Sequence, residues 1–296
     1  MNRQTVPCSM RLAILAAILG VSLSHAPIGA QEHVGPKADP VLLDPALLAA
    51  VAEAETRGQM LHKYDQAAWH ATDALFTSIR PEEVEDGRGY VVVPRESDAM
   101  LDTIFVVERD GALRQFARYT IDGSTVVGGG VLNGELPPLE PLAARMFAAR
   151  EPAIAAMRAE EFGLCSRSNP NTLVLPPDER GNIAFYLLTS TNSNANFPMG
   201  GHYRADVSPE GNAVSTRRYM NTCFDLPRDT PPGPDGQPGH AGVTYLLGET
   251  PSEIHVFVGY HMPNGFMVIT TSNKKLWLVQ DGKITLQQDG FDSPQP

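Results

Sequence analysis

Four histidines in the C-terminal half of the chain are the side chains with the widest choice of chemistry. They are His202, His240, His255 and His261. Imidazole binds zinc and also serves as a general base near neutral pH. His255 and His261 would lie about 20 Å apart along a strand, which is too far for one ion. Because no His-Glu-x-x-His motif or close cysteine pair accompanies the histidines, we predict no metal site and no cofactor.

The alternative use of these histidines is acid–base chemistry in a hydrolase. His202 and His255, together with Asp or Glu side chains from distant strands, would form such a site. The chain has no Gly-x-Ser-x-Gly motif, and Ser272 and Lys275 fit Ser-x-x-Lys only between two expected strands. A hydrolase with His202 and His255 at its site stays an alternative, because sequence spacing does not show which distant side chains meet.

A cluster of polar and aromatic side chains lies in the first helical segment. His70 and Asp73 would be neighbours three positions apart on a helix, an arrangement in which a carboxylate orients an imidazole base. The same pattern is typical of a solvated helix face. Because Trp69 and Phe76 lie on this side, we interpret the face as a packing surface. The cluster consists of His62, Asp65, Gln66, Trp69, His70 and Asp73.

The strongest binding candidate is a surface formed by two loops. Residues 191–200 are rich in asparagine, and residues 227–239 hold five prolines and three glycines. We expect both loops at one end of the later sheet, where neutral amides would bind a sugar or a peptide. Arginines on neighbouring strands would recognise an anionic group, unless they pair with surface acids. The predicted ligand-binding residues are His202, Arg204, Arg217, Asn194 and His255.

Helical patterns occupy two stretches of the chain, and these must position the candidate residues. The pair Asp44-Pro45 is typical of a helix start, and the pattern continues to about Ile79. Gly58 is a point at which this helix is expected to divide in two. A second helical block, rich in Ala, Leu and Met, spans about 139–161.

Short apolar runs separated by turn residues fill the rest of the chain. Turns at 110–111 and 122–123 separate or end three runs near 90–121, which predicts an antiparallel meander. The fold class is therefore α+β, with two helical blocks and a mostly antiparallel, sheet-rich C-terminal half. The strands expected in that half are 182–190, 201–207, 213–220, 243–248, 253–261, 266–271, 275–280 and 283–287.

Residues 1–30 are typical of a secretory signal peptide. Two arginines flank the start of an apolar stretch at 12–23, which is too short to span a bilayer. We expect cleavage after Ala30, or alternatively after Ala26. Removal of the two arginines changes the formal charge from −11 to −13, which disfavours nucleic acid as a partner. We expect a periplasmic or secreted protein with no membrane span in the mature chain.

The mature chain keeps two of the three cysteines, Cys165 and Cys223. An even number of cysteines in an exported protein predicts a disulfide. Such a bond would close a loop of 58 positions, which stabilises a fold by about 4 kcal/mol in the chain-entropy model. The alternatives are two buried thiols or half of a metal site.

Three short segments are distinctive: Tyr-Asp-Gln-Ala-Ala-Trp at 64–69, Gly-Gly-His-Tyr-Arg at 200–204 and Glu-Ile-His-Val-Phe at 253–257. Together they resemble an uncharacterised group of exported bacterial proteins. The resemblance covers most of the mature chain. Because the group has no assigned activity, the resemblance implies export and a single shared architecture across 44–287, but no catalytic residue.

These patterns together predict a flexible arm at 31–43 and one α+β unit at 44–296. The unit is expected to have two lobes, with helices and a small meander at 44–161 and an antiparallel sheet at 162–296. We expect a non-catalytic exported protein that binds a small molecule, a glycan or another envelope protein. The hydrolase is the alternative, and a pocket that gathers His202 and His255 would favour it.

Overall fold

The computed structural model describes residues 43–84, 86–191 and 193–290. The expected signal peptide, its cleavage sites and most of the expected arm lie outside these residues. The described chain contains four α-helices and four sheets, and most of its strand pairs are antiparallel. The α+β class is therefore confirmed, and the helical blocks are one N-terminal helix and a pair of short helices in the middle of the chain.

Helix α1 (Pro45–Ser78) begins and ends as the sequence indicates. The Asp44 carboxylate accepts a hydrogen bond from the Ala46 amide at 2.7 Å, which satisfies a free backbone donor at the helix start. The expected break at Gly58 was wrong, because α1 is continuous. Gly58 instead allows close packing: a Cβ there would lie 2.4 Å from the Val256 Cβ.

The first sheet is the predicted meander with one further strand. Its order is β1–β2–β3–β4, and each neighbouring pair is antiparallel. Asp110 and Gly111 both adopt positive φ in the turn between the second and third strands. The fourth strand was not predicted, because three successive glycines at 128–130 show no alternation of side chains. The strands are β1 (Gly87–Pro94), β2 (Leu101–Arg109), β3 (Ala112–Asp122) and β4 (Thr125–Val131).

Two short helices follow, α2 (Pro141–Ala148) and α3 (Arg150–Ala159), and a 3₁₀ turn lies earlier at Pro81–Glu83. The second sheet has the order β5–β6–β8–β9 and is antiparallel throughout. A separate two-stranded ribbon pairs a strand of the first loop, β7, with β10, which ends where the second loop begins. The strands are β5 (Asn171–Val174), β6 (Ile183–Leu188), β7 (Asn196–Pro198), β8 (Tyr203–Val207), β9 (Ala213–Arg218) and β10 (Asp225–Pro227).

The last sheet has the order β11–β12–β13–β14. Its first pair is parallel and the other two are antiparallel. The parallel pair arises because a helix, α4, connects the two strands, and parallel neighbours need a crossover connection. The elements are β11 (Ala241–Tyr245), α4 (Glu253–Gly259), β12 (Phe266–Thr270), β13 (Lys275–Gln280) and β14 (Lys283–Asp289).

The strand expected at 253–261 was wrong, because this segment forms α4. All seven residues of the helix are buried, so no polar face shows a helical period. Its start is marked by Ser252, which forms a reciprocal capping box with the His255 side chain. A capping box with histidine in place of Glu or Gln is easily overlooked in a sequence.

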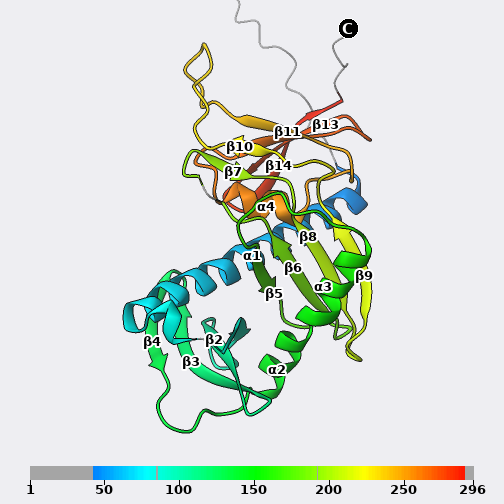
Figure 1. Cartoon of the computed structure of the whole chain (residues 1–296). Helices are drawn as coiled ribbons and strands as arrows, with labels where there is room; N and C mark the ends of the chain where they lie inside the picture. Colours follow the sequence, from blue (N-terminus) through cyan, green and yellow to red (C-terminus); the bar gives the residue numbers. More distant parts are fainter. Residues whose placement is uncertain (1–42, 85, 192, 291–296) are drawn as a thin grey trace, which may run out of the picture. The chain divides into compact units, whose positions relative to one another are not determined.

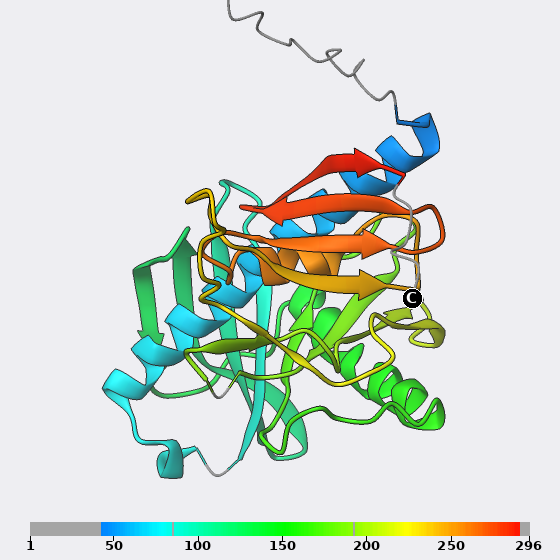
Figure 2. The same ribbon diagram turned by 90° about the horizontal axis from the view of Figure 1, so that it is seen from above.

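Helix α1 is the element around which the others pack. It contacts all four strands of the first sheet, and it also contacts α4, β5 and β14. Figures 1 and 2 show the helix passing from the β11–β14 sheet to the first sheet. Buried apolar side chains of α1, α4 and the sheets form one contiguous cluster. The long helix therefore joins the sequence segments that were expected to form two lobes.

The predicted disulfide between Cys165 and Cys223 is present. The Cα atoms are 5.3 Å apart, within the range that a disulfide requires. The bond connects the segment after α3 to the segment after β9. Gly201 packs directly against it, since a Cβ there would lie 2.7 Å from the sulfur of Cys165.

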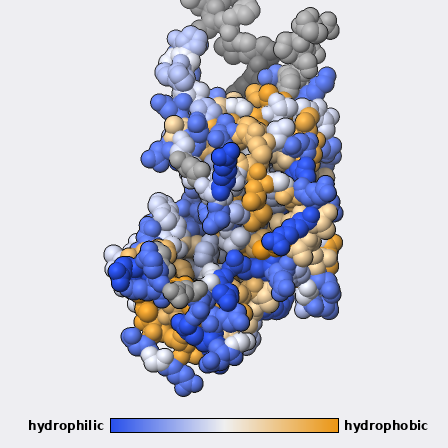
Figure 3. All heavy atoms as spheres, viewed as in Figure 1, coloured by the Kyte–Doolittle hydropathy of each residue, from blue (hydrophilic) through white to orange (hydrophobic). Residues whose placement is uncertain are grey.

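The described helices include none that is long and apolar enough to cross a membrane. On the face drawn in Figure 3, hydrophilic and hydrophobic residues are interspersed.

Candidate functional site

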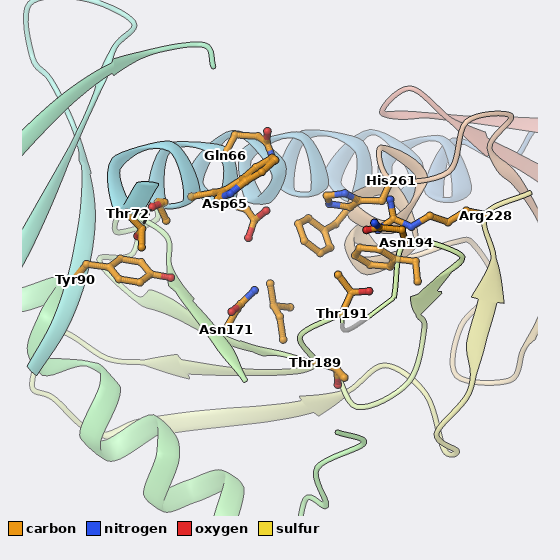
Figure 4. A pocket seen from close by; sticks show the side chains of 15 residues that line it. Asp65, Gln66, Thr72, Tyr90, Asn171, Thr189, Thr191, Asn194, Arg228 and His261 are labelled. Carbon is orange, nitrogen blue, oxygen red and sulfur yellow. Dashed lines mark hydrogen bonds between the residues drawn. The ribbon is translucent and has the colours of Figure 1, made fainter. Parts of the chain in front are cut away.

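A cavity of about 570 Å³ lies where α1, the ends of several strands and α4 meet (Figure 4). One wall comes from α1, and another comes from β1 and β5. The remaining walls come from Thr189, Thr191 and Asn194, from β7, from the residue after β10 and from the end of α4. We call this cavity the α1 pocket. Its walls belong to segments that are far apart in the sequence.

Helix α1 presents one stripe of side chains to the pocket. Asp65, Trp69 and Thr72 are spaced four and three residues apart, so they lie on one helix face. Burial raises the pKa of Asp65 from 3.8 to about 6, although a hydrogen bond with Gln66 acts in the opposite direction. Within the described residues, no cationic nitrogen lies within 4 Å of this carboxylate.

Tyr90 of β1 lies on the side of the pocket nearest Asp65. Its hydroxyl donates a hydrogen bond to the Thr172 carbonyl at 3.1 Å. Burial raises the pKa of this phenol to about 12, and the negative charge of Asp65 adds to the increase. The charge of the Asp65 carboxylate therefore acts on the Tyr90 phenol. Figure 4 shows both side chains pointing into the cavity, with Asn171 near them.

His261 lies on the opposite side, within an aromatic cluster. Its ring stacks on Phe197 at 4.4 Å and meets the edge of Phe257 at 5.1 Å. Burial lowers its pKa to about 4, and nearby His62 and Arg228 lower it further. The imidazole is thus neutral at pH 7. Its buried Nε2 has no hydrogen-bond partner among the described residues.

Arg228 provides a positive charge at this side. Its guanidinium carbon lies 5.1 Å from the centre of the Phe197 ring, which is a cation–π contact. Its amide donates to the Ala195 carbonyl at 2.8 Å, so the two loops are joined here. The side-chain Nε is buried and has no described hydrogen-bond partner. No carboxylate oxygen of the described chain lies within 4 Å of the guanidinium.

Trp69 provides a large accessible apolar surface at the pocket. The residue is 55% exposed, and its indole stacks on His70 at 5.0 Å. Amide and hydroxyl groups of Asn171, Asn194 and Thr191 complete the lining. An exposed aromatic ring beside neutral polar groups is an arrangement that suits a small ligand with both apolar and polar parts.

His202, predicted at the site, is a buried structural histidine. Its Nδ1 accepts from the Thr189 amide at 3.2 Å, and its Nε2 donates to the Pro198 carbonyl at 3.0 Å. Burial lowers its pKa to about 4. The ring therefore stays neutral and joins the two ends of the loop that borders the α1 pocket. It positions this loop without lining the pocket.

His255, also predicted at the site, caps α4. Its Nδ1 accepts from the Ser252 amide at 3.1 Å and lies 2.8 Å from the Ser252 hydroxyl. Burial lowers the pKa of His255 to about 3, and nearby Arg217 and His202 contribute to the decrease. The structure therefore brings His202 and His255 into the same region, but neither ring borders the α1 pocket.

Arg204 and Arg217 meet at the buried carboxylate of Glu253. Arg204 Nη1 lies 3.3 Å from Oε1, and Arg217 Nη1 lies 3.5 Å from Oε2. The hydroxyls of Tyr186 and Tyr219 donate to Oε1. Burial raises the pKa of Glu253, but Arg217, Tyr219 and Arg204 outweigh it, so the pKa is lowered. The anion that these arginines bind is thus a residue of the same chain.

Asn194 is the predicted ligand-binding residue that lines the α1 pocket. The sequence interpretation treated Asp65 and Trp69 as a packing face and did not single out Tyr90, Asn171, Arg228 or His261 as a group. The available signal was the spacing of Asp65 and Trp69 on a helix whose neighbouring positions are alanines. Across the described ranges, no group of three or more His, Cys, Asp or Glu side chains is arranged to hold a metal ion.

No family model, no curated protein and no solved structure matches this chain. The resemblance to exported bacterial proteins therefore stays a prediction.

Proposed function

We propose that this protein binds a small ligand that has both polar groups and an apolar face, and that the α1 pocket is the binding site. The observation that carries the proposal is the composition of the cavity wall. Trp69 offers an accessible aromatic surface, while Asp65, Asn171 and Arg228 present polar groups to the same cavity. A volume of about 570 Å³ lies in the range that small-molecule sites occupy.

We further infer that the protein works in the periplasm or outside the cell. The disulfide between Cys165 and Cys223 supports this, because such bonds persist in oxidising compartments. The formal charge of −11 supports a partner other than nucleic acid. A small molecule or glycan is the partner that the pocket favours over another envelope protein, since a cavity suits a ligand that enters it.

Tryptophan fluorescence tests the proposed binding site, because the two tryptophans of the chain differ in exposure. Trp69 borders the pocket and is 55% exposed. Trp277 is fully buried, and its indole N–H donates a hydrogen bond to the Thr270 hydroxyl at 2.9 Å. We expect a saturable change in emission when a binding compound is titrated, and we expect Trp69→Phe to abolish it. The probes are neutral disaccharides, free amino acids and short peptides.

Paired asparagine variants provide the control for this titration. Asn194→Ala should weaken binding, because Asn194 borders the pocket. Asn212→Ala should leave binding unchanged, because Asn212 is an exposed residue between β8 and β9. A saturable signal that survives in Trp69→Phe, or an equal loss in both asparagine variants, would place the ligand elsewhere and contradict the proposal.

Hydrolysis is the second candidate function, and one observation favours it. A carboxyl group with a pKa near 6 is suited to general acid–base catalysis near neutral pH, and Asp65 is such a group. The hydrolase proposal now centres on Asp65, because the polar atoms of His202 are engaged in structural hydrogen bonds. Turnover of chromogenic glycosides or esters that disappears in Asp65→Asn would support it. Binding without turnover would favour the binding protein.

A further inference from the structure

The α1 pocket contains two ionisable groups of opposite sign, and neither is paired with a charged group of the described chain. Asp65 on α1 and Arg228 after β10 both border the cavity. No described ion pair of 4 Å or less includes either residue. Figure 4 shows the two side chains on different sides of the cavity, with His261 drawn between them in this view.

Two other partly buried arginines of this chain are paired with carboxylates. Arg118 pairs with Asp102 at 3.1 Å, and Arg204 pairs with Asp206 at 2.7 Å and with Glu253 at 3.3 Å. Burying a charge is costly unless it is paired, and the fold supplies carboxylate partners to these two arginines. Arg150 and Arg218 also lack a carboxylate within 4 Å among the described residues, but of these three arginines Arg228 is the one that borders the α1 pocket, where a ligand would pair with it and with Asp65.

The surroundings keep both groups in place when no ligand is bound. The Arg228 guanidinium is stacked on Phe197, and its backbone amide donates a hydrogen bond to the Ala195 carbonyl. Asp65 lies in the middle of a 34-residue helix, so its position is set by α1. A site whose charged groups are already positioned loses little conformational entropy on binding.

Neutral polar groups lie beside each of the two charged side chains and supply further hydrogen bonds to a ligand. Near Asp65 are the Tyr90 hydroxyl and the Asn171 amide, which supply oxygens for a cationic donor. Near Arg228 is Asn194, whose side-chain amide supplies donors for an anionic acceptor. Trp69 lies between the polar groups of α1 and offers its ring to an apolar side chain.

We propose that the ligand is a zwitterion with a free ammonium group and a free carboxylate, namely an amino acid or a short peptide. Its ammonium group binds at Asp65, and its carboxylate forms paired hydrogen bonds with the guanidinium of Arg228. An apolar side chain of the ligand packs on Trp69. The proposal rests on the proposed function, because it names the ligand class of the same pocket.

A series of leucine compounds tests the two charges separately. The probes are leucine, Leu-Gly and Leu-Gly-Gly, with N-acetyl-Leu-Gly and Leu-Gly-amide as derivatives that lack one charge. Binding is measured by calorimetry and by Trp69 emission. We expect at least one zwitterion to bind. Each blocked derivative of Leu-Gly should bind at least about tenfold more weakly than Leu-Gly, because one charge-assisted hydrogen bond is lost. The length series separates a free amino acid from a peptide.

Variants assign each charge to its residue. Arg228→Gln should remove the preference for a free carboxylate, so that Leu-Gly and Leu-Gly-amide bind equally. Asp65→Asn should remove the preference for a free amine in the same way. Arg228→Lys keeps the charge without the paired donors and should give an intermediate preference, which provides a second test if Arg228→Gln folds poorly.

Matched control variants lie outside the pocket. Arg218 is also stacked on a phenyl ring, with its guanidinium carbon 5.0 Å from the Phe162 centre, so Arg218→Gln controls for loss of a cation–π contact. Asp73→Asn controls for loss of a carboxylate on α1, because Asp73 is exposed two turns further along. Both controls should keep the preferences of the wild type.

Several outcomes would overturn the proposal. If a neutral disaccharide changes Trp69 emission while no zwitterion does, the ligand class is wrong and the proposed function stands. If blocked derivatives bind as tightly as Leu-Gly, the charges are not recognised. An equal effect of Arg218→Gln and Arg228→Gln would show that the carboxylate is bound elsewhere. No response to any probe would contradict both the ligand class and the proposed function.

Discussion

Asp65→Asn is predicted to stabilise the protein at neutral pH and to have little effect on stability in acid. Asp65 lies on a pocket wall, and its pKa is raised from 3.8 to about 6 because burial penalises the charged form. No cation of the described chain pairs with it to offset this penalty. Asparagine has nearly the same shape and carries no charge, so it removes the penalty while keeping the packing on α1.

The sign of the stability change follows from the protonation of Asp65 in the folded and the unfolded state. The folded protein holds the proton on Asp65 up to about pH 6, whereas the unfolded chain releases it near pH 4. Wild-type stability therefore falls as the pH rises between these values. A difference of about two pKa units at roughly 1.4 kcal/mol each gives an upper limit near 3 kcal/mol. Because the side chain keeps some contact with solvent, we expect a gain of about 1–3 kcal/mol above pH 6.

Urea unfolding with the disulfide intact measures this difference. The free energy of unfolding of Asp65→Asn minus that of the wild type should increase between about pH 4 and about pH 7.5. The change with pH is the decisive quantity, since loss of the Gln66 hydrogen bond adds an offset that does not titrate. Asp73→Asn should show no such change. A difference that is constant with pH, or one that decreases toward neutral pH, would refute the reasoning.

Three further predictions concern the fold that supports the pocket. Gly58→Ala should destabilise the protein by about 2 kcal/mol or more despite the better helix propensity of alanine, because the new methyl group would lie 2.4 Å from the Val256 Cβ. Urea unfolding measures this loss, and a gain in stability would contradict the prediction. Replacing Cys165 and Cys223 together by Ala should lower stability by about 2–4 kcal/mol and leave ligand binding intact, as parallel unfolding and fluorescence titrations would show. Glu253→Gln should cost about 3 kcal/mol at pH 7, because it leaves Arg217 without a carboxylate partner and leaves Arg204 with Asp206 alone. The pKa of Glu253 is lowered, so its contribution is present above pH 4.5 and is lost as the pH falls through the folded value; an effect of equal size at pH 3 would argue against this account.

The sequence by itself determined the elements whose signals are local. The start of α1 at Asp44 follows from capping chemistry, and the turn at Asp110 and Gly111 follows from the backbone freedom of those residues. The pairing of Cys165 with Cys223 follows from the number of cysteines outside the expected signal peptide. The helix start and the turn depend on residues that are adjacent in the chain. Two cysteines can form only one intramolecular disulfide.

Only the tertiary structure decided α4 and the pocket. All of α4 is buried, so its residues show no periodicity, and burial is a property of the surrounding elements. The charges of Arg204 and Arg217 were visible in the sequence, but Glu253 was hidden in a segment that was expected to be a strand. The α1 pocket joins Asp65 to Arg228 across 163 positions. Nothing local to either residue indicates the other, because their proximity is produced by the packing of α1 against distant strands and loops.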